Sequence, residues 1–529
     1  MATPPDLQRI SDYVFHYAEH QPDQDALVQE SRRWTYREFA DEVDRFARAL
    51  LAAGVRKGDR IAFMATPRPE CFLAFVANAS IGGITVGLNP KFPIGELRYF
   101  LGDAEPKLLM GFARDAEGDH TEVLRTLDGE HDFIERTVIL GEEAHGATTS
   151  WSAWLEEGGG VSRDELSRAR DAVETMDAAL IVYTSGTTGR PKGAILPHRG
   201  LVYCSRVQAD HWDVEPLRII CNLPVNHIGF MGDICSYALV AGGTIFYMEK
   251  FDPPRILELI QEERITGWGQ VPTMFQITLA LPNFGQYDLS SLQGVIWGGA
   301  NAPREMIAAL MKTGARVGTG FGMTETTGSV VYTDADAELE TLAVTVGRPD
   351  PRYEVRIADP NGVPVKPGQK GEIQVRGDHI MLGYWRRPEA TREAIDFEGW
   401  LHTGDVAMLR EDGNYVIRGR LSEMYKSGGE NVYPREVELV LEEHPKVALA
   451  AVFGVPDPVY SEVGSAYVIR WPGTDPTEEE LRAFCKQRLA NFKVPKAIVV
   501  RDILPMLPIG KVDKVTLKKE VIPEAEARG

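Results

Sequence analysis

An eleven-residue segment combines glycines, hydroxyl side chains and a lysine. It reads Y-T-S-G-T-T-G-R-P-K-G from Tyr183 to Gly193 and follows an apolar run. Glycines let backbone N–H groups converge on an anion, hydroxyls donate to phosphate oxygens, and the Lys192 ammonium adds a point charge. The segment predicts a phosphate loop without Walker A spacing, and the alternative is an ordinary glycine-rich turn. The residues assigned to it are Thr184, Ser185, Gly186, Thr187, Thr188, Gly189 and Lys192.

A second segment, from Gly320 to Glu325, places an aromatic ring, a hydroxyl and a carboxylate close together. It reads G-F-G-M-T-E. Mg²⁺ prefers carboxylate and phosphate oxygens, and Glu325 can supply one of them. Taken alone, the pair Thr324-Glu325 is as readily a solvent-facing part of a loop, so this segment gains meaning only together with the first.

The order of residues in the first segment resembles the phosphate loop of the AMP-forming adenylating superfamily. That family includes acyl- and aryl-CoA synthetases, peptide-synthetase adenylation domains and luciferases. The second segment resembles the family's second nucleotide motif. The resemblance implies that Phe321 stacks near adenine, that Thr324 touches phosphate, and that Glu325 helps to hold magnesium.

Two later segments resemble further motifs of the same family. Thr403-Gly404-Asp405 resembles the ribose-binding aspartate motif, and Arg420 resembles the arginine that also reaches the ribose. Taken alone, Asp405 would be interpreted as a turn residue. The stretch 371–384, with its glycines and Tyr384, resembles a motif whose role is mainly structural, and no chemistry is assigned to it.

The segment from Leu223 to His227 resembles the stretch in which a histidine borders the acid-binding pocket. A lone histidine is more often a packing residue, so His227 is interpreted as pocket-lining rather than as a general base. No arginine or lysine in this stretch could pair with a second carboxylate, which favours a hydrophobic monocarboxylic acid. The predicted pocket residues are His227, Phe230, Met231, Trp297, Asn301 and Gly322.

The C-terminal part carries two more motifs. The stretch 426–431, K-S-G-G-E-N, resembles the hinge-proximal motif of CoA ligases, which implies that the pantetheine arm passes Gly428 and Gly429. The stretch 507–511, L-P-I-G-K, resembles the loop that bears the family's adenylation lysine, here Lys511. Ser422 departs from the family, which commonly has aspartate or lysine at this hinge position; the departure concerns domain rotation rather than the chemistry.

The resemblance implies an enzyme that activates a carboxylic acid with ATP and Mg²⁺ as an acyl-adenylate, releases pyrophosphate, and transfers the acyl group to CoA. Thr324, Glu325 and Lys511 are then the catalytic residues, with Glu325 as the metal ligand. Two alternatives stay open: a freestanding adenylation enzyme that loads a carrier protein, and a homologue that performs only one half-reaction.

The elements that must position these residues are predicted from hydrophobic periodicity. The first four hundred residues alternate helical patterns with short β-branched runs, which indicates α/β layers. Thr35 to Glu38 forms a capping box at the start of a helix. Strands are predicted at 179–183, 243–248 and 294–297, and the uncharged run 71–88 is interpreted as a buried helix followed by a strand.

The pattern changes near Arg420. The remainder predicts a compact α+β unit with a helix after Pro434, strands at 448–455 and 465–471, and a helix that begins after Thr477. The fold class is therefore α/β, with a large multi-layered N-terminal domain at 1–420 and a small mobile α+β domain at 421–529.

Charge and composition exclude several classes of protein. The chain has 529 residues, with 57 basic against 77 acidic groups and a net charge of −20, which argues against a nucleic-acid-binding surface. Nine basic residues nevertheless lie between Lys486 and Lys519, either as a solvated face or as a surface for small polyanions. Five cysteines without a C-x-x-C pair, and a first segment without a secretory pattern, predict a cytoplasmic protein. No membrane span is predicted, and a homodimer is possible.

Overall fold

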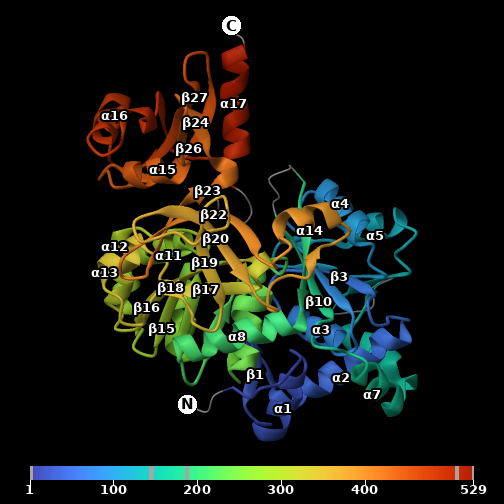
Figure 1. The fold of residues 1–529 in the computed structure, drawn as a ribbon. Coiled ribbons are helices and arrows are strands. Elements are labelled where there is room, and N and C mark those ends of the chain that lie inside the picture. Colours follow the sequence, from blue (N-terminus) through green and yellow to red (C-terminus); the bar gives the residue numbers. More distant parts are fainter. Residues whose placement is uncertain (1–3, 142–147, 185–189, 507–511, 527–529) are drawn as a thin grey trace. The chain divides into compact units, whose positions relative to one another are not determined.

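A computed structural model describes residues 4–141, 148–184, 190–506 and 512–526 (Figure 1). Its packing divides the chain into two compact units. The first comprises residues 1–355 with 375–401, and the second comprises residues 356–374 with 402–529. The domain division predicted between residues 420 and 421 is a separate hypothesis and stays a prediction.

A nine-stranded sheet forms one layer of the first unit, in the order β18-β17-β16-β15-β14-β12-β13-β1-β2. Strands β1, β13, β12, β14, β15 and β16 run parallel to one another, and β2, β17 and β18 pair antiparallel with their neighbours. The bounds are β1 (Asp25–Gln29), β2 (Arg32–Thr35), β12 (Arg218–Cys221), β13 (Thr244–Tyr247), β14 (Gly267–Gln270), β15 (Gly294–Trp297), β16 (Arg316–Met323), β17 (Gly328–Tyr332) and β18 (Arg348–Pro349).

An eight-stranded sheet forms a second layer, in the order β21-β11-β10-β4-β3-β5-β8-β9. Its bounds are β3 (Arg60–Met64), β4 (Ile84–Leu88), β5 (Leu108–Phe112), β8 (Arg136–Leu140), β9 (Thr148–Thr149), β10 (Ala178–Thr184), β11 (Lys192–Pro197) and β21 (Gly383–Tyr384). A short hairpin of β6 (Arg114–Asp115) and β7 (Gly118–Asp119) stands apart. The strands predicted at 179–183, 243–248 and 294–297 are thus β10, β13 and β15.

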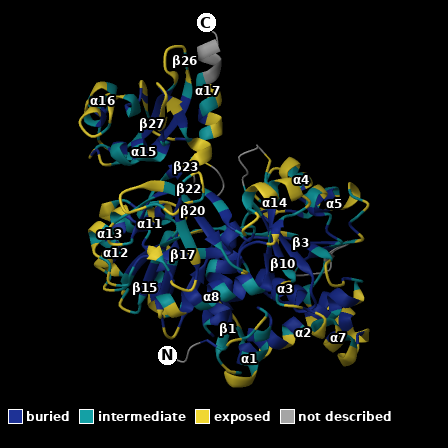
Figure 2. Ribbon diagram, in the orientation of Figure 1, coloured by how far each residue is buried: buried dark blue, intermediate teal, exposed yellow. Residues whose placement is uncertain are grey.

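Helices of the first unit pack on these sheets, and Figure 2 shows buried residues concentrated where sheets and helices meet, as along α8. The bounds are α1 (Asp12–His20), α2 (Tyr36–Ala52), α3 (Pro69–Ser80), α4 (Ile94–Ala104), α5 (Thr121–Gly129), α6 (Trp151–Glu156), η1 (Glu157–Gly160), α7 (Arg163–Asp171), α8 (His198–Trp212), η2 (Gly229–Ser236), α9 (Tyr237–Val240), α10 (Pro253–Glu262), α11 (Pro272–Leu279), η3 (Phe284–Gln286), α12 (Arg304–Met311), η4 (Thr324–Thr326), α13 (Leu339–Val344) and α14 (Pro388–Ala394).

Local sequence explains two of these helices. The capping box of α2 is present, with the Thr35 side chain accepting from the Glu38 backbone N–H, and the helix presents an apolar stripe to the core. Every residue of α3 is buried, so the uncharged run after residue 71 is a core helix followed by β4. Burying each large apolar side chain of such a helix stabilises the fold by about 1.5–3 kcal/mol.

The second unit contains two sheets. One is four-stranded in the order β19-β20-β22-β23, and the other has the order β25-β24-β27-β26, with β28 paired to β27. The bounds are β19 (Glu354–Ala358), β20 (Lys370–Arg376), β22 (Leu401–Leu409), β23 (Tyr415–Arg420), β24 (Tyr425–Ser427), β25 (Glu430–Val432), β26 (Val447–Asp457), β27 (Ser461–Arg470), β28 (Ala497–Arg501), η5 (Leu421–Glu423), α15 (Pro434–Glu442), α16 (Glu478–Lys486), η6 (Asn491–Lys493) and α17 (Lys514–Glu526).

The elements predicted for the C-terminal part are all present. Helix α15 begins at Pro434, and α16 has the capping box formed by Thr477 and Glu480. Part of the basic run between residues 486 and 519 is paired inside this unit, because Lys493 contacts Glu436 at 2.7 Å and Lys514 contacts the buried Glu438 at 2.7 Å. Those two lysines therefore serve the fold rather than a solvated face.

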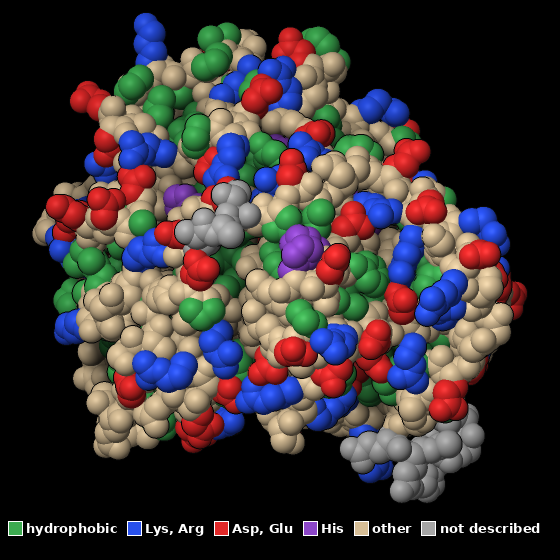
Figure 3. All heavy atoms as spheres, turned by 90° about the horizontal axis from the view of Figure 1, so that it is seen from below, with side chains coloured by type: hydrophobic (Ala, Val, Ile, Leu, Met, Phe, Trp, Pro, Cys, Tyr) green, Lys and Arg blue, Asp and Glu red, His purple; other side chains and the backbone are tan. Residues whose placement is uncertain are grey.

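The predicted fold class is confirmed: a large α/β part with several sheets and a small α+β part. Within the described residues, no helix has the length and apolar character needed to cross a membrane. On the face of the molecule drawn in Figure 3, basic and acidic side chains are mixed, and that face offers no extended basic tract for a nucleic acid.

Candidate functional site

Three predicted site segments lie at or after the ends of three parallel strands of the nine-stranded sheet. The segment that contains His227 follows β12, the segment that contains Asn301 follows β15, and Phe321 lies near the end of β16. Register pairs Trp297 of β15 with Thr319 of β16, so these strands reach the same edge. The carboxyl edge of a parallel sheet is where α/β proteins bind ligands, and the topology brings the predicted acid and adenine segments there.

The predicted phosphate loop joins two antiparallel strands, β10 and β11, as a hairpin. Thr184 and Lys192 are directly opposite each other in the register. The Tyr99 hydroxyl donates to the Pro191 carbonyl at 2.6 Å, which fixes one end of the connection. Five residues assigned to the loop lie outside the described residues: Ser185, Gly186, Thr187, Thr188 and Gly189.

Lys192 and Glu325 both contact Tyr384. The Lys192 Nζ lies 4.9 Å from the centroid of the Tyr384 ring. This cation–π contact holds the ammonium beside the β10–β11 hairpin. The Tyr384 hydroxyl donates to Glu325 Oε1 at 2.8 Å. Strand β21 positions this tyrosine, because Tyr384 pairs with Ala194 of β11.

The Glu325 carboxylate is buried, with 4% of the residue exposed, and neutral groups hold it. Besides Tyr384, the Thr184 hydroxyl donates to Oε1 at 3.1 Å. Its backbone is also held, since the Met381 N–H donates to the Glu325 carbonyl at 2.8 Å. Hydroxyl donors leave the carboxylate its full negative charge, so the arrangement suits a hard cation. Thr324 precedes it in the same short helix, η4, and is also buried.

Tyr384 is a candidate site residue that the sequence motifs did not identify. It was grouped with the structural stretch 371–384 and given no chemistry. Its signal in the sequence is weak, because a tyrosine after a glycine is common and the contact with Glu325 joins residues 59 positions apart. Only the pairing of β21 with β11 brings the ring to the phosphate-loop hairpin.

The predicted acid-pocket residues differ in their exposure. Phe230, Met231 and Trp297 are buried, and Trp297 belongs to the core cluster that also contains Trp268. Asn301 and His227 are half-buried. The Gly229 N–H donates to His227 Nδ1 at 2.9 Å, so a neutral imidazole carries its proton on Nε2. Their assignment to a pocket stays a prediction.

Backbone proximity explains the glycine in the adenine segment. A Cβ atom at Gly322 would lie 2.1 Å from the Gly328 carbonyl oxygen, because β16 and β17 bulge between Phe321 and Gly322. No side chain fits at that position without moving the strand. Phe321 itself is half-buried on β16, opposite Val331 of β17.

In the second unit, the register of β22 and β23 places Asp405 opposite Arg420. The Arg420 Nε donates to Asp405 Oδ1 at 3.0 Å, and Nη2 donates to Oδ2 at 3.4 Å. Asp405 is 6% exposed, whereas the Arg420 side chain is 44% exposed. The two predicted ribose residues are therefore joined in one forked ion pair.

A second carboxylate positions the Asp405 strand. Glu372 of β20 accepts from the Gly404 N–H through Oε1 at 2.9 Å, and its Oε2 lies 2.7 Å from His402 Nδ1. The Thr403 hydroxyl donates to the Ile373 carbonyl at 2.8 Å. Glycine is required at 404, where φ is +73°. Glu372 thus orients the strand that carries Asp405, although it lies in the stretch 371–384, to which no chemistry is assigned.

The glycine pair of the predicted pantetheine motif forms a tight turn. Gly428 and Gly429 join β24 to β25 with φ values of +62° and +90°, as a two-residue hairpin of this hand requires. A Cβ atom at Gly429 would meet no other atom within 4 Å, so the backbone faces open space. Ser422 lies in η5, and Lys511 lies outside the described residues.

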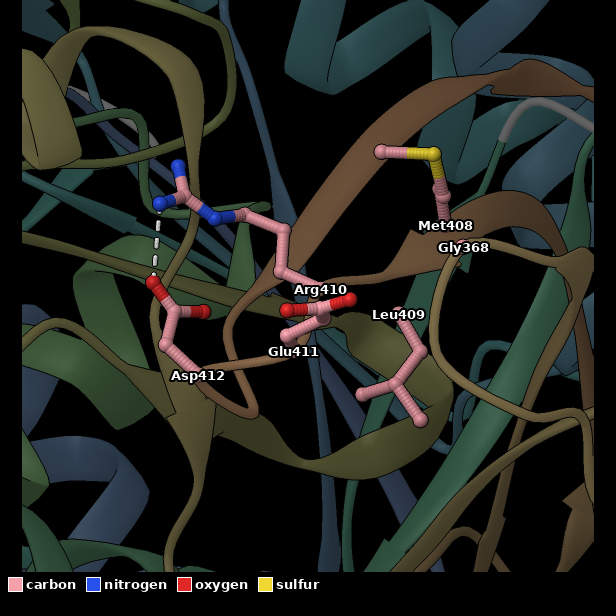
Figure 4. A pocket seen from close by; sticks show the side chains of 6 residues that line it. All are labelled: Gly368, Met408, Leu409, Arg410, Glu411 and Asp412. Carbon is pink, nitrogen blue, oxygen red and sulfur yellow. Dashed lines mark ion pairs between the residues drawn. The ribbon is translucent and has the colours of Figure 1, made fainter.

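Two surface recesses lie near these segments. One, of about 690 Å³, borders the phosphate-loop hairpin and is lined by Tyr99, Arg190 and Pro191 among others. The other, of about 380 Å³, lies at the turn after β22, where Arg410 and Asp412 form an ion pair at 2.8 Å (Figure 4). Figure 4 shows Arg410 and Asp412 directed at each other across this turn, which marks it as a structural crevice.

No cluster of three or more histidine, cysteine or acidic side chains suited to a metal ion occurs in the part of the chain that the structure describes. A complete protein cage for a metal is therefore not found there. A single carboxylate such as Glu325 still fits the way Mg²⁺ binds beside a nucleotide, where phosphates and water complete the shell.

Comparison with known proteins adds independent findings. The family model described as AMP-binding enzyme matches residues 14–385, and the model of the AMP-binding enzyme C-terminal domain matches residues 436–511. A feruloyl-CoA synthase of Amycolatopsis sp is 36% identical over 491 residues, which cover 92% of this chain and 93% of the relative. A 3-[(3aS,4S,7aS)-7a-methyl-1,5-dioxo-octahydro-1H-inden-4-yl]propanoyl:CoA ligase of Mycobacterium tuberculosis is 34% identical and covers 97% and 99% of the two chains.

A solved structure resembles the whole chain. The crystal structure of ATP-bound MatB from Rhodopseudomonas palustris superposes with a TM-score of 0.83, at 29% sequence identity, and the match covers 97% of this chain and 98% of that one. The predicted fold thus recurs in a protein that was crystallised with ATP.

Proposed function

The chain belongs to the AMP-binding enzyme family, and we propose that it is an AMP-forming acid–CoA ligase. The observation that carries the proposal is the Glu325 carboxylate, which two neutral hydroxyls hold beside the phosphate-loop hairpin and its Lys192. The relatives named as CoA ligases, each matching over nine-tenths of this chain, support CoA as the acceptor.

The first half-reaction activates the acid. A carboxylate is a poor electrophile, because its charge repels nucleophiles and it lacks a leaving group. One carboxylate oxygen of the substrate bonds to the α-phosphorus of ATP, the bond from that phosphorus to the bridging oxygen breaks, and pyrophosphate leaves. Lys192 and Thr184 are proposed to compensate charge on the phosphates, because fixed donors stabilise such charge without reorganisation.

Magnesium has one clear protein ligand in this scheme. Glu325 would hold the ion through its carboxylate, while Thr184 and Tyr384 fix that carboxylate from one side. When bound, Mg²⁺ supplies charge neutralisation on phosphate oxygens. Thr324, in the same short helix, is proposed to donate to the α-phosphate.

The second unit contributes to nucleotide binding and to the second half-reaction. Asp405 is proposed to accept from the ribose hydroxyls while Arg420 holds its orientation. CoA would approach along the open backbone at Gly428 and Gly429. Its thiolate attacks the acyl carbonyl, a C–S bond forms, and AMP departs with the electrons of the broken C–O bond. The small domain is proposed to turn between the two half-reactions.

The acid is proposed to be a hydrophobic monocarboxylic acid. Phe230 and Met231 beside the predicted pocket are apolar, and no basic side chain occurs in the stretch 228–231. The two named relatives act on acids of different skeletons, so the family does not specify the acid. Cytoplasmic location and a homodimer remain predictions.

Two half-reaction assays test the proposal. Purified protein with Mg²⁺ and acids of graded size and aromaticity should catalyse acid-dependent ATP–pyrophosphate exchange and then form a CoA thioester. Exchange without thioester formation, even from supplied acyl-adenylate, would favour the carrier-loading enzyme or the one-half-reaction homologue. Absence of AMP with every acid would overturn the proposal.

Lys511 offers a sharper test, because its proposed role is confined to adenylation. Lys511→Ala should reduce pyrophosphate exchange by about 10²–10³-fold, the scale for losing one preorganised charge donor. Thioester formation from supplied acyl-adenylate should be spared. Lys518→Ala, in the same basic run, serves as the control and should leave both rates unchanged. Equal losses in both half-reactions would remove the assignment of Lys511.

A further inference from the structure

Asp233 stands out in the segment that follows His227. It lies in the π-helical segment η2, and the other seven residues of that segment are buried. Asp233 alone keeps part of its surface accessible. π-Helical segments are rare and occur frequently at functional sites, because the extra residue per turn redirects a side chain.

The Asp233 carboxyl is largely enclosed by protein and, within the described residues, has no charged partner. Burial raises its pKa to about 7, and among the described residues neither a cation nor a hydrogen-bond donor offsets that burial. Part of the side chain nevertheless remains accessible. A largely enclosed carboxylate without a partner is costly, so its retention at an accessible position points to a ligand.

The Asp233 carboxyl lies near both the predicted acid segment and the predicted adenine segment. Asp233 Oδ1 lies 3.3 Å from the position that a Cβ atom would take at Gly328, whose φ is +153°. Gly328 pairs with Met323, and its carbonyl oxygen lies against Gly322. The carboxyl therefore lies beside Gly328, at the start of the strand that follows Thr324 and Glu325.

The residues beside the carboxyl on this side are small. The Cβ and Sγ atoms of Cys204, on α8, lie 3.3 and 3.9 Å from the same Cβ position at Gly328. Cys204 is a buried thiol and a poor donor, and its own Sγ is directed to the Thr326 carbonyl at 3.5 Å. Glycine at 328 leaves the carboxyl open to this side. Nothing described around it competes with a ligand for the Asp233 oxygens.

We propose that Asp233 is a specificity-determining residue of the acid site, and that it accepts a hydrogen bond from a hydroxyl or amino group of the acid, remote from the reacting carboxylate. The inference rests on the proposed function, since it identifies the acid of that same site. It narrows the substrate from a hydrophobic acid to one whose apolar body ends in a donor. An unsubstituted acid would leave the buried carboxyl unpaired, and such a loss discriminates strongly between substrates.

The test compares matched acids on wild-type protein and variants. The acids are cinnamic acid with its para-hydroxy and para-amino derivatives, and octanoic acid with its terminal hydroxy and amino derivatives. Wild type should use a donor-bearing acid with kcat/KM about 10–100-fold above that of its parent, the scale of a hydrogen bond to a charged group. In the octanoic series, preference for the hydroxy or for the amino derivative identifies the donor as neutral or cationic; the arylamine is neutral near pH 7 and serves as a second neutral donor.

Asp233→Ala should abolish this preference, and Asp233→Asn should keep part of it because the amide oxygen still accepts. Asp128→Asn, on exposed α5, should keep all of it. Thermal melting identifies a variant that fails to fold, and Asp233→Asn then decides. AMP formation without any preference in wild type, or an unchanged preference in the Asp233 variants, would overturn the inference alone. Absence of AMP with every acid would instead overturn the proposed function.

Discussion

The two units each hold a buried carboxylate at a candidate nucleotide-binding segment, and the partners of the two carboxylates differ. In the first unit, neutral hydroxyls of Thr184 and Tyr384 hold Glu325. In the second, the guanidinium of Arg420 holds Asp405. Hydroxyls orient a carboxylate and leave its charge, whereas arginine orients and largely neutralises it. A carboxylate is thereby suited to a metal cation in the first unit and to sugar hydroxyls in the second.

Replacing the first carboxylate should have the largest effect. Glu325→Gln keeps the shape and the acceptor but removes the charge, and we expect pyrophosphate exchange to fall by about 10²–10³-fold with a weaker dependence on Mg²⁺. A magnesium titration of the exchange rate measures both effects. Glu305→Gln, on the exposed face of α12, should change neither. An unaltered magnesium midpoint in Glu325→Gln would show that Glu325 is not a ligand.

Asp233 extends the comparison to a carboxyl for which the described residues provide no partner. Its folded-state pKa of about 7 lies above the usual aspartate value, so the folded protein binds more protons than the unfolded chain between about pH 4 and 7. The free energy of unfolding should therefore fall as pH rises through this window. Asp233→Asn removes this pH-dependent loss of stability. The free energy of unfolding of the variant should exceed that of wild type by a margin that is about 3 kcal/mol larger at pH 8 than at pH 5. Denaturant unfolding of both proteins at the two pH values measures the difference, and equal pH dependence would refute it.

Replacing the second carboxylate should affect nucleotide binding more than metal use. We expect Asp405→Asn to raise the KM for ATP by about 10–100-fold, because hydrogen bonds from ribose hydroxyls to a charged acceptor weaken. The magnesium midpoint should stay unchanged, in contrast to Glu325→Gln. Kinetics with ATP and with deoxy-ATP check the assignment: the ratio of their KM values should shrink in the variant, and a constant ratio would contradict ribose contact.

Removing one neutral partner should have the smallest effect. Tyr384→Phe keeps the ring beneath Lys192 and deletes the hydroxyl that donates to Glu325 at 2.8 Å. We expect pyrophosphate exchange to fall about fivefold, the scale of one net hydrogen bond, with a modest rise in the magnesium midpoint. Tyr203→Phe loses an exposed bond to the Arg352 carbonyl and is the matched control. Loss of more than about 100-fold would mean that Tyr384 contacts substrate directly.

Local patterns predicted the elements of the fold well. Thr35 and Thr477 cap helices α2 and α16, as predicted. The apolar runs at 179–183 and 294–297 form β10 and β15. These predictions depend on neighbouring residues only. The pairing order of two large sheets depends on contacts between distant segments, so periodicity could not supply it.

The candidate site was predicted in part for the same reason. Motif residues such as Thr184, Glu325 and Asp405 were recognisable because each lies in a short contiguous string. Tyr384 and Glu372 act through residues far along the chain, and a single sequence contains no sign of those contacts. Asp233 was also overlooked, since an aspartate among apolar residues is informative only when its surroundings are known.

The Glu372 contact has a practical consequence for recombining this protein with its relatives. Glu372 on β20 accepts a hydrogen bond from the Gly404 N–H. Residues 375–401, which lie between them in the sequence, belong to the other unit. A chimera with its crossover inside that stretch would join Glu372 from one parent to the aspartate loop from another. Crossovers before residue 356 or after Arg420 would inherit the carboxylate, the glycine and the aspartate as one set, and libraries built on those borders should retain more active members.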